Sequence, residues 1–248
     1  MSTALTDCHL PERSVLELEG LDRVPFLNGL VSNEISDRPV YAAFLSPQGR
    51  ILHGVFILPQ EECILLDVES KDAQNILTLL SRYRLRSKVE FSLTSSAVIA
   101  SPEEKPGGYR DPRLPALGWR SVSASTSLPE GTESYARHCH ALGLPASLPS
   151  GLLPHEANLD LLNGISFSKG CYIGQELTAR IQHRNLVKKR LFAVSGPAAE
   201  AAGPIYAGEK EAGTLSGDFA LLRMELARQP LTVSSLPLNV FWPDWMPQ

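Results

Sequence analysis

The chain has 248 residues, of which 43% are hydrophobic and 20% are charged, as in globular proteins and unlike disordered ones. At about 150 residues per domain, this length accommodates one or two domains. The 23 basic and 27 acidic side chains give a formal net charge of −4. Because general polyanion binders are usually basic, nucleic acid is not expected as a direct partner.

The first residues show neither a basic flank nor an apolar core of signal-peptide length. No apolar run approaches the roughly 20 residues that a membrane span needs. Without C-x-x-C pairs, neither a structural zinc site nor a disulfide framework is expected. We therefore predict a cytoplasmic protein with no membrane partner and four free thiols: Cys8, Cys63, Cys139 and Cys171.

The first strands are predicted from alternating and apolar runs. Residues 13–20 alternate in hydrophobicity and predict a half-buried strand, followed by a short helix with Asp22 as its N-cap. Residues 41–45 and 51–58 predict two more strands. The sequence SPQG between them suits a type I turn, so we predict a hairpin.

The rest of the first hundred residues continues this mixed pattern. Residues 63–68 predict a strand, and Ser70 is the predicted cap of a helix that runs to about Arg84. Residues 89–93 and 97–100 predict two further strands. This order of elements is typical of an α+β domain with a largely antiparallel sheet.

Proline- and glycine-rich stretches divide the remainder of the chain. Residues 102–115 predict a boundary or long loop, residues 133–142 a helix, and residues 143–154 a second loop. From Leu191 onward, short strands and glycines predict a small β-barrel or sandwich. We thus predict an N-terminal lobe over residues 1–100, a middle lobe over 101–186, and a C-terminal barrel and tail over 187–248.

The densest candidate for chemistry is the sequence SKGCYIGQE at residues 168–176. Lys169 lies two residues before Cys171, and a helix is predicted from about Gly174 to Arg180. A nearby cation and a helix N-terminus lower the pKa of a thiol, which makes it a better nucleophile or metal ligand. The alternative interpretation is that Cys171 is a small buried hydrophobic residue in a turn.

The segment KGCYIGQE resembles the signature of the YgfZ-type folate-binding proteins, which are relatives of the T protein of the glycine cleavage system. Their mitochondrial members act in iron–sulfur protein maturation. Collinear matches to the family's pattern are GLD (20–22), FLNGL (26–30), LSPQGR (45–50), DPR (111–113) and PHEANL (154–159). The resemblance implies an α+β, T-protein-like folate-binding fold: two related lobes around a central pocket, plus a small C-terminal β-barrel.

The resemblance also implies a function. It indicates a non-catalytic accessory protein that binds tetrahydrofolate or a derivative and acts in iron–sulfur cluster assembly or repair, with indirect effects on tRNA modification. The implied partners are reduced folate and iron–sulfur assembly proteins or client enzymes. The family's functional thiol matches Cys171, as cluster ligand, redox thiol or electrophile trap, with Lys169 beside it. The residues expected to bind folate are Arg13, Asn33, Tyr135, Glu156, Tyr172, Gln175 and Glu176.

The chain departs from the family's pattern before Gly143. Where relatives have an arginine and a glutamate, this chain has Cys139 and Ala141. A carboxylate at the second position would accept two N–H bonds from a pterin ring, so its absence weakens the expected folate affinity. Arg13 and Tyr135 fall where some relatives carry tryptophans beside the folate. Tyr135 can stack on a flat ring, and Arg13 can do so only as a guanidinium plane.

Two other functions remain open. A folate-dependent aminomethyltransferase needs a carboxylate near the folate nitrogen, and Asn33 followed by Glu34 is the nearest candidate. A thiol-based redox protein needs a second cysteine brought close to Cys171 by folding. The run His138–His140 is not a predicted metal site, because successive residues of a helix point about 100° apart.

Two basic clusters interrupt the acidic average, at residues 82–88 and 180–190. Each is either a solvated face or a docking surface for the polyglutamate tail of a folate, for an acidic partner protein or for RNA, although no RNA-recognition module is present in the sequence.

Overall fold

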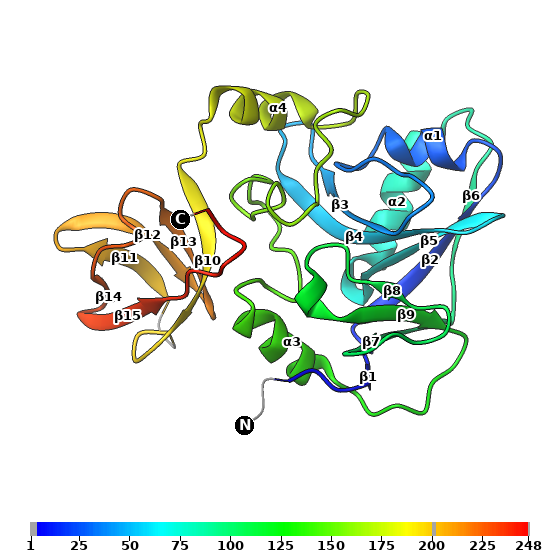
Figure 1. Cartoon of the computed structure of the whole chain (residues 1–248). Helices are drawn as coiled ribbons and strands as arrows, with labels where there is room; N and C mark the ends of the chain where they lie inside the picture. The colour runs from blue at the N-terminus through cyan, green and yellow to red at the C-terminus, as the bar shows by residue number, and fades with distance from the viewer. Residues whose placement is uncertain (1–3, 200–201, 248) are drawn as a thin grey trace.

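The computed structural model describes residues 4–199 and 202–247, and in them the strands form two open sheets and one closed barrel. The two open sheets belong to adjoining lobes, and the barrel lies to one side of them (Figure 1). This arrangement confirms the predicted α+β class with a C-terminal β-barrel.

The first sheet is antiparallel and has the strand order β3-β4-β5-β2-β6. Its strands are β2 (Arg13–Glu19), β3 (Val40–Leu45), β4 (Ile51–Pro59), β5 (Cys63–Glu69) and β6 (Glu90–Leu93). The predicted hairpin is present between β3 and β4, where the amide of Gly49 donates to the carbonyl of Ser46 at 2.8 Å. Gly49 has a φ of +76°, which glycine adopts without strain.

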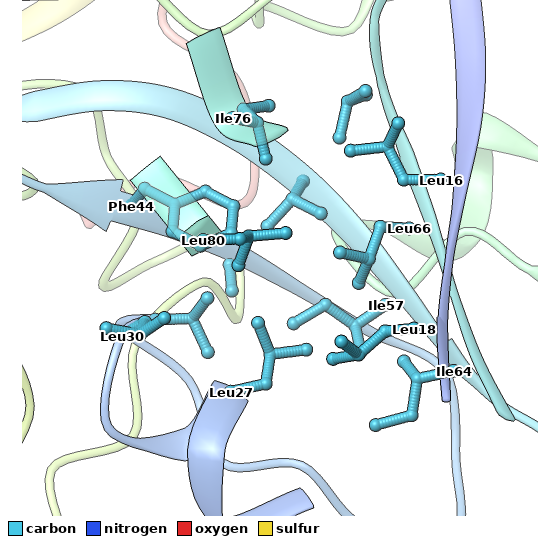
Figure 2. Packing of buried hydrophobic residues seen from close by; sticks show 14 of the residues in the cluster. Leu16, Leu18, Leu27, Leu30, Phe44, Ile57, Ile64, Leu66, Ile76 and Leu80 are labelled. Carbon is cyan, nitrogen blue, oxygen red and sulfur yellow. The ribbon is translucent and has the colours of Figure 1, made fainter. Parts of the chain in front are cut away.

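One face of this sheet packs against helices α1 (Arg23–Asn28) and α2 (Ala73–Arg84). Figure 2 shows Leu27 of α1 and Ile76 and Leu80 of α2 directed toward Leu18 and Leu66 on the strands. The period of two along the strands and the 3–4 residue spacing along α2 bring these apolar side chains to one layer. The opposite face of the sheet is therefore left to contact the second lobe.

Asp22 occupies the predicted N-cap position of α1, whereas the predicted cap of α2, Ser70, is wrong. The Asp22 side chain makes no cap hydrogen bond; its Oδ2 instead accepts the amide of Lys88 at 2.7 Å, which ties α1 to the start of β6. Ser70 lies in a 3₁₀ turn, η1 (Ser70–Asp72), and Asp72 occupies the cap position of α2. The Asp22 side chain thus bonds outside its own helix, and the 3₁₀ turn moves the start of α2 past Ser70.

The second lobe contains a four-stranded antiparallel sheet in the order β1-β7-β9-β8, together with η2 (Pro115–Leu117) and α3 (Thr132–Ala141). Its strands are β1 (Cys8–His9), β7 (Ala97–Ser101), β8 (Tyr109–Arg110) and β9 (Trp119–Ser123). The sequence did not predict β1, β8 or β9, because two of them have only two residues and show no periodicity. Residues 102–115 are thus not a simple loop.

The C-terminal part is a closed barrel in the order β10-β13-β12-β11-β14-β15. Its strands are β10 (Lys189–Ser195), β11 (Gly203–Ala207), β12 (Lys210–Ser216), β13 (Phe219–Arg223), β14 (Leu231–Val233) and β15 (Leu236–Val240). Arg190 joins the barrel to the lobes, because its guanidinium forms two bonds to Asp160, at 2.9 and 2.7 Å, and one to the carbonyl of His155. Helix α4 (Gln175–Arg184) lies in the segment that leads to the barrel (Figure 1).

Candidate functional site

The segment that carries Cys171 is a surface loop fixed by Lys169. The Lys169 ammonium donates to the carbonyls of Asn28, Val31 and Asn33 at 2.9, 2.8 and 2.6 Å. These carbonyls lie at and after the C-terminal end of α1, where a helix leaves acceptors without internal partners. Lys169 therefore joins the loop to the first lobe.

Residues on the other side of Cys171 anchor the loop as well. Tyr172 is buried, and its amide donates to the Gln175 side chain at 3.2 Å. Ile173 packs against the core of the first lobe, and its amide donates to the carbonyl of Gly29 at 3.2 Å. Gly174, at the N-cap of α4, has a φ of +80° and lies against the β3–β4 turn. The backbone on both sides of Cys171 is thus held in place.

Cys171 itself is the exposed cysteine of the chain. Cys8 and Cys139 are buried, and Cys63 is intermediate. Burial, with the carboxylate of Glu17 nearby, raises the pKa of Cys63 to about 11, so that thiol stays protonated at neutral pH. The interpretation of Cys171 as a buried hydrophobic residue is therefore wrong, because the residue is exposed between anchored neighbours.

The predicted activation of Cys171 by Lys169 has no geometric support among the described residues, where no hydrogen bond or ion pair joins the two side chains. The ammonium instead points at the three carbonyls and lies 5.0 Å from the ring centre of Tyr172. Burial lowers the pKa of Lys169 to about 8, against a smaller opposing effect of Glu34. Lys169 positions the loop, and the N-terminal end of α4 follows three residues after Cys171.

The lowered pKa of Lys169 predicts a pH-dependent stability between about pH 8 and 10.5. In this range the unfolded chain holds a proton that the folded chain has released, so stability increases with pH. We expect the free energy of unfolding of the wild type, minus that of Lys169→Met, to rise by roughly 1–3 kcal/mol over this range. The figure follows because one pKa unit corresponds to about 1.4 kcal/mol. Urea denaturation of both proteins at several pH values measures it, and a constant difference would contradict the prediction.

The residues expected to bind folate are distributed over separate parts of the molecule. Arg13 and Tyr135 are buried between the two lobes, and the Tyr135 hydroxyl lies 2.7 Å from Arg113 Nη2 and 2.8 Å from Arg120 Nη1. Glu156 lies near the barrel and accepts the amide of Leu153 at 2.9 Å.

The other expected folate residues surround the Cys171 loop. The amide nitrogen of Asn33 donates to the carbonyls of Tyr41 and Asn163 at 2.9 and 2.7 Å. Burial raises the pKa of Tyr172 to about 12, so its phenol is neutral. The side-chain oxygen of Gln175 accepts the amide of Tyr172, and Glu176 is exposed in the first turn of α4. Apart from Glu176, these side chains have structural partners.

The positions linked to folate by the resemblance do not face one common region. Ala141, at the family's glutamate position, lines a cleft of about 680 Å³ between α3 and the barrel, together with His140 and Phe219. Tyr135 lies on the buried face of the same helix, together with Cys139. The positions that a single pterin would have to contact therefore face different regions.

Sequence reasoning missed the most heavily bonded side chains between the lobes, Asp67 and Arg120. The Asp67 carboxylate is fully buried and accepts bonds from Arg13 and from Arg120, each as short as 2.6 Å. A signal was present, because Asp67 interrupts the apolar run of β5 on the face opposite Ile64, Leu66 and Val68. A carboxylate at such a position requires a buried cation as partner.

Part of the second basic cluster is also structural. Arg190 is buried and paired with Asp160, whereas Arg180, Arg184 and Lys188 are exposed. Only the exposed members of this cluster are available to a partner.

Comparisons with known proteins agree with the fold. Residues 188–248 match the family described as CAF17, C-terminal beta-barrel domain. The chain is 32% identical to the iron-sulfur cluster assembly factor IBA57, mitochondrial, of Mus musculus, over 98% of this chain and 86% of that protein. The Homo sapiens protein of the same name is also 32% identical, over 96% of this chain and 84% of that protein.

Among solved structures, the glycine cleavage system aminomethyltransferase T from Bartonella henselae is similar, with a TM-score of 0.68 at 11% identity. The match covers 97% of this chain and 86% of that chain. At this identity the likeness shows the T-protein-like fold alone.

The predicted cytoplasmic location is contradicted by these comparisons, because the relatives are named mitochondrial factors. The prediction rested partly on free thiols, and free thiols do not distinguish one reducing compartment from another. None of the helices in the described residues is long and apolar enough to cross a membrane.

Proposed function

This chain belongs to the YgfZ-like family that includes the IBA57 iron–sulfur cluster assembly factors, and from that membership we propose that it acts as an accessory factor in iron–sulfur cluster assembly or repair. The observation that carries the proposal is the exposed thiol of Cys171 on a loop anchored from both sides. Cysteine thiolates are the usual ligands of iron–sulfur clusters. A fixed and accessible thiol fits a ligand that is offered to another protein.

A single thiolate does not hold a cluster, because [2Fe–2S] and [4Fe–4S] clusters take about four protein ligands. In residues 4–199 and 202–247, no group of three or more His, Cys, Asp or Glu side chains could hold a metal ion. The remaining ligands would therefore come from a partner, either an iron–sulfur assembly protein or a client enzyme. Of the three roles considered for Cys171, we propose that of a shared cluster ligand.

The redox alternative gains no support from the other three thiols. Cys63 is partly exposed, but its pKa is raised to about 11, so this thiol stays protonated at neutral pH. Cys8 and Cys139 are 2% and 0% exposed, and the pKa of each is raised by burial. Oxidation to an intramolecular disulfide would require these side chains to leave the core. The aminomethyltransferase alternative also gains no support. The side-chain amide of Asn33 donates to two backbone carbonyls, and Glu34, the adjacent carboxylate, is exposed.

Exposed residues near Cys171 in the sequence support docking of a protein partner. Phe167 and Leu177, in the segments just before and after the loop, are 44% and 36% exposed. The exposed Arg180 and Arg184 follow on α4. Such a mixture of apolar and cationic side chains suits a partner with an acidic rim. The predicted effect on tRNA modification would then be indirect, through client enzymes, and it stays a prediction.

The proposal is tested in cells that lack the gene. Cys171→Ala is expected to restore the activity of iron–sulfur enzymes no better than an empty vector, whereas wild type and Cys63→Ala restore it. Cys63 is the matched control because it is the other thiol that is not fully buried. Equal melting temperatures of the purified variants exclude a folding defect. Full restoration by Cys171→Ala would contradict the proposal.

A further inference from the structure

Three arginines converge on one phenyl ring in the contact between the two lobes. The guanidinium carbons of Arg120, Arg113 and Arg13 lie 4.1, 4.9 and 5.5 Å from the ring centre of Phe56. Arg120 and Arg113 have side chains that are 2% exposed, and that of Arg13 is 7% exposed. Guanidinium groups stack well on aromatic faces when they are removed from water.

Buried carboxylates neutralise these cations. Asp67 Oδ2 accepts Nε and Nη2 of Arg120 at 3.2 and 2.6 Å, and its Oδ1 accepts Nε of Arg13 at 2.6 Å. Arg13 also donates to Glu69 at 2.7 Å, and Asp111 accepts two bonds from Arg113. Burial alone would raise the pKa of Asp67, but Arg120 and Arg13 outweigh it and the net shift is downward. The carboxylate is therefore ionised.

The residues around Arg120 resemble a pterin-binding site in their chemistry, and the Arg120 guanidinium takes the part of the pterin ring. The pyrimidine half of a pterin is a flat guanidine-like group whose N–H donors pair with a carboxylate and whose face stacks on an aromatic ring. The Arg120 guanidinium does both, against Asp67 and Phe56. The two positions that the resemblance places beside a folate, Arg13 and Tyr135, bond to the same cluster: Arg13 to Asp67, and Tyr135 to Arg120.

We propose that the Arg120 guanidinium, paired with Asp67 and stacked on Phe56, fills a site between the lobes where a carboxylate and an aromatic face would otherwise suit a pterin ring, so that this chain functions without bound folate. The cluster already satisfies the carboxylates and the Tyr135 hydroxyl, and a pterin would have to displace a paired and buried arginine. Ejecting that arginine would leave charge buried without a partner, which costs several kcal/mol. This inference does not depend on the role of Cys171.

The first test is calorimetric titration of the wild type with 5-formyltetrahydrofolate, a reduced folate that is stable in air. We expect no saturable heat at ligand concentrations up to about 1 mM, the range in which specific small-molecule binding is detected. Saturable binding with one site per chain would overturn the proposal. A Cys171→Ala protein is expected to behave as the wild type does, which separates this result from the proposed cluster role.

The second test asks whether Arg120 fills a guanidine-shaped site. Arg120→Ala is compared with Arg110→Ala, an arginine of the neighbouring strand whose guanidinium lies 6.0 Å from the ring centre of Trp119 and whose residue is exposed. At a concentration about five-fold above its Kd, methylguanidinium is expected to raise the melting temperature of Arg120→Ala by roughly 2–4 °C and that of Arg110→Ala not at all. If Arg120→Ala does not fold alone, the readout is its refolding yield with and without methylguanidinium. Equal responses of the two variants would overturn the proposal.

Discussion

Asp67→Ala is expected to lower the free energy of unfolding by roughly 3–5 kcal/mol, the range for removing one partner of a buried ion pair. Asp67 is fully buried and serves two arginines on different sheets, Arg13 on β2 and Arg120 on β9. Arg13 keeps Glu69 as an ionised partner, whereas Arg120 keeps the neutral Tyr135 hydroxyl. The loss therefore arises from an uncompensated charge between the lobes.

Urea denaturation measures this effect, and a surface ion pair provides the control. Glu133 bonds to Arg137 at 3.3 Å on the same helix, and the Glu133 side chain is 90% exposed. Because exposed pairs contribute about 0–1 kcal/mol, Glu133→Ala is expected to change stability by less than roughly 1 kcal/mol. Similar losses in the two variants would mean that the interlobe pairs are solvated.

Acid should weaken the same contact. Because the pKa of Asp67 lies below its ordinary value of 3.8, its pairing stabilises the fold fully above about pH 4. That contribution is lost as the pH falls further and the carboxylate takes up a proton. As the pH falls below 4, the free energy of unfolding of Asp67→Ala should therefore decrease less than that of the wild type.

Gly174→Ala is the second change with a large expected effect, because it alters the residue that joins the Cys171 loop to α4. Gly174 has a φ of +80°, and a Cβ there would lie 2.5 Å from the carbonyl oxygen of Ser46 and 2.8 Å from Cβ of Leu45. Backbone strain alone costs about 1–3 kcal/mol, and the clash with the β3–β4 turn adds to it. We expect lower stability together with a displaced loop.

The position of the loop is measurable through the thiol. In the wild type, Cys171 should react with a thiol reagent at a single rate, and Gly174→Ala should change that rate as α4 separates from the β3–β4 turn. Gly170→Ala is the matched control, because no described atom lies within 4 Å of a Cβ at that position. If Gly174→Ala has the stability and thiol reactivity of Gly170→Ala, the glycine does not position the loop.

Much of the first lobe could be predicted from the sequence. Alternation identified β2, turn residues identified the β3–β4 hairpin, and spacing identified α2 and its buried residues Ala73, Ile76 and Leu80. The resemblance of residues 169–176 to a family signature indicated the T-protein-like fold and the importance of Cys171. Strands β1 and β8 were missed because edge strands of two residues derive their form from their neighbours, and β9 was missed because its sequence WRSVS does not alternate apolar and polar residues.

The candidate site was predicted less well than the fold. Sequence proximity suggested that Lys169 acts on Cys171, but the acceptors of its ammonium are 136 to 141 residues away in the chain. The folate assignment grouped Arg13 and Tyr135 with residues of the Cys171 loop, whereas the structure places them in the buried cluster of Asp67 and Arg120. A position within a motif does not indicate which partner a side chain meets.

The sequence alone determined where strands, turns and helices form along much of this chain, and which cysteine lies in a glycine-flanked segment suited to chemistry. These properties follow from backbone preferences and hydrophobic periodicity, which act over a few residues. Only the tertiary structure decided that Cys171 faces solvent, that Lys169 fixes its loop, and that Arg120 meets Asp67 across 53 residues. The physical reason is that burial and charge pairing depend on which surfaces pack together, and that is a property of the whole fold.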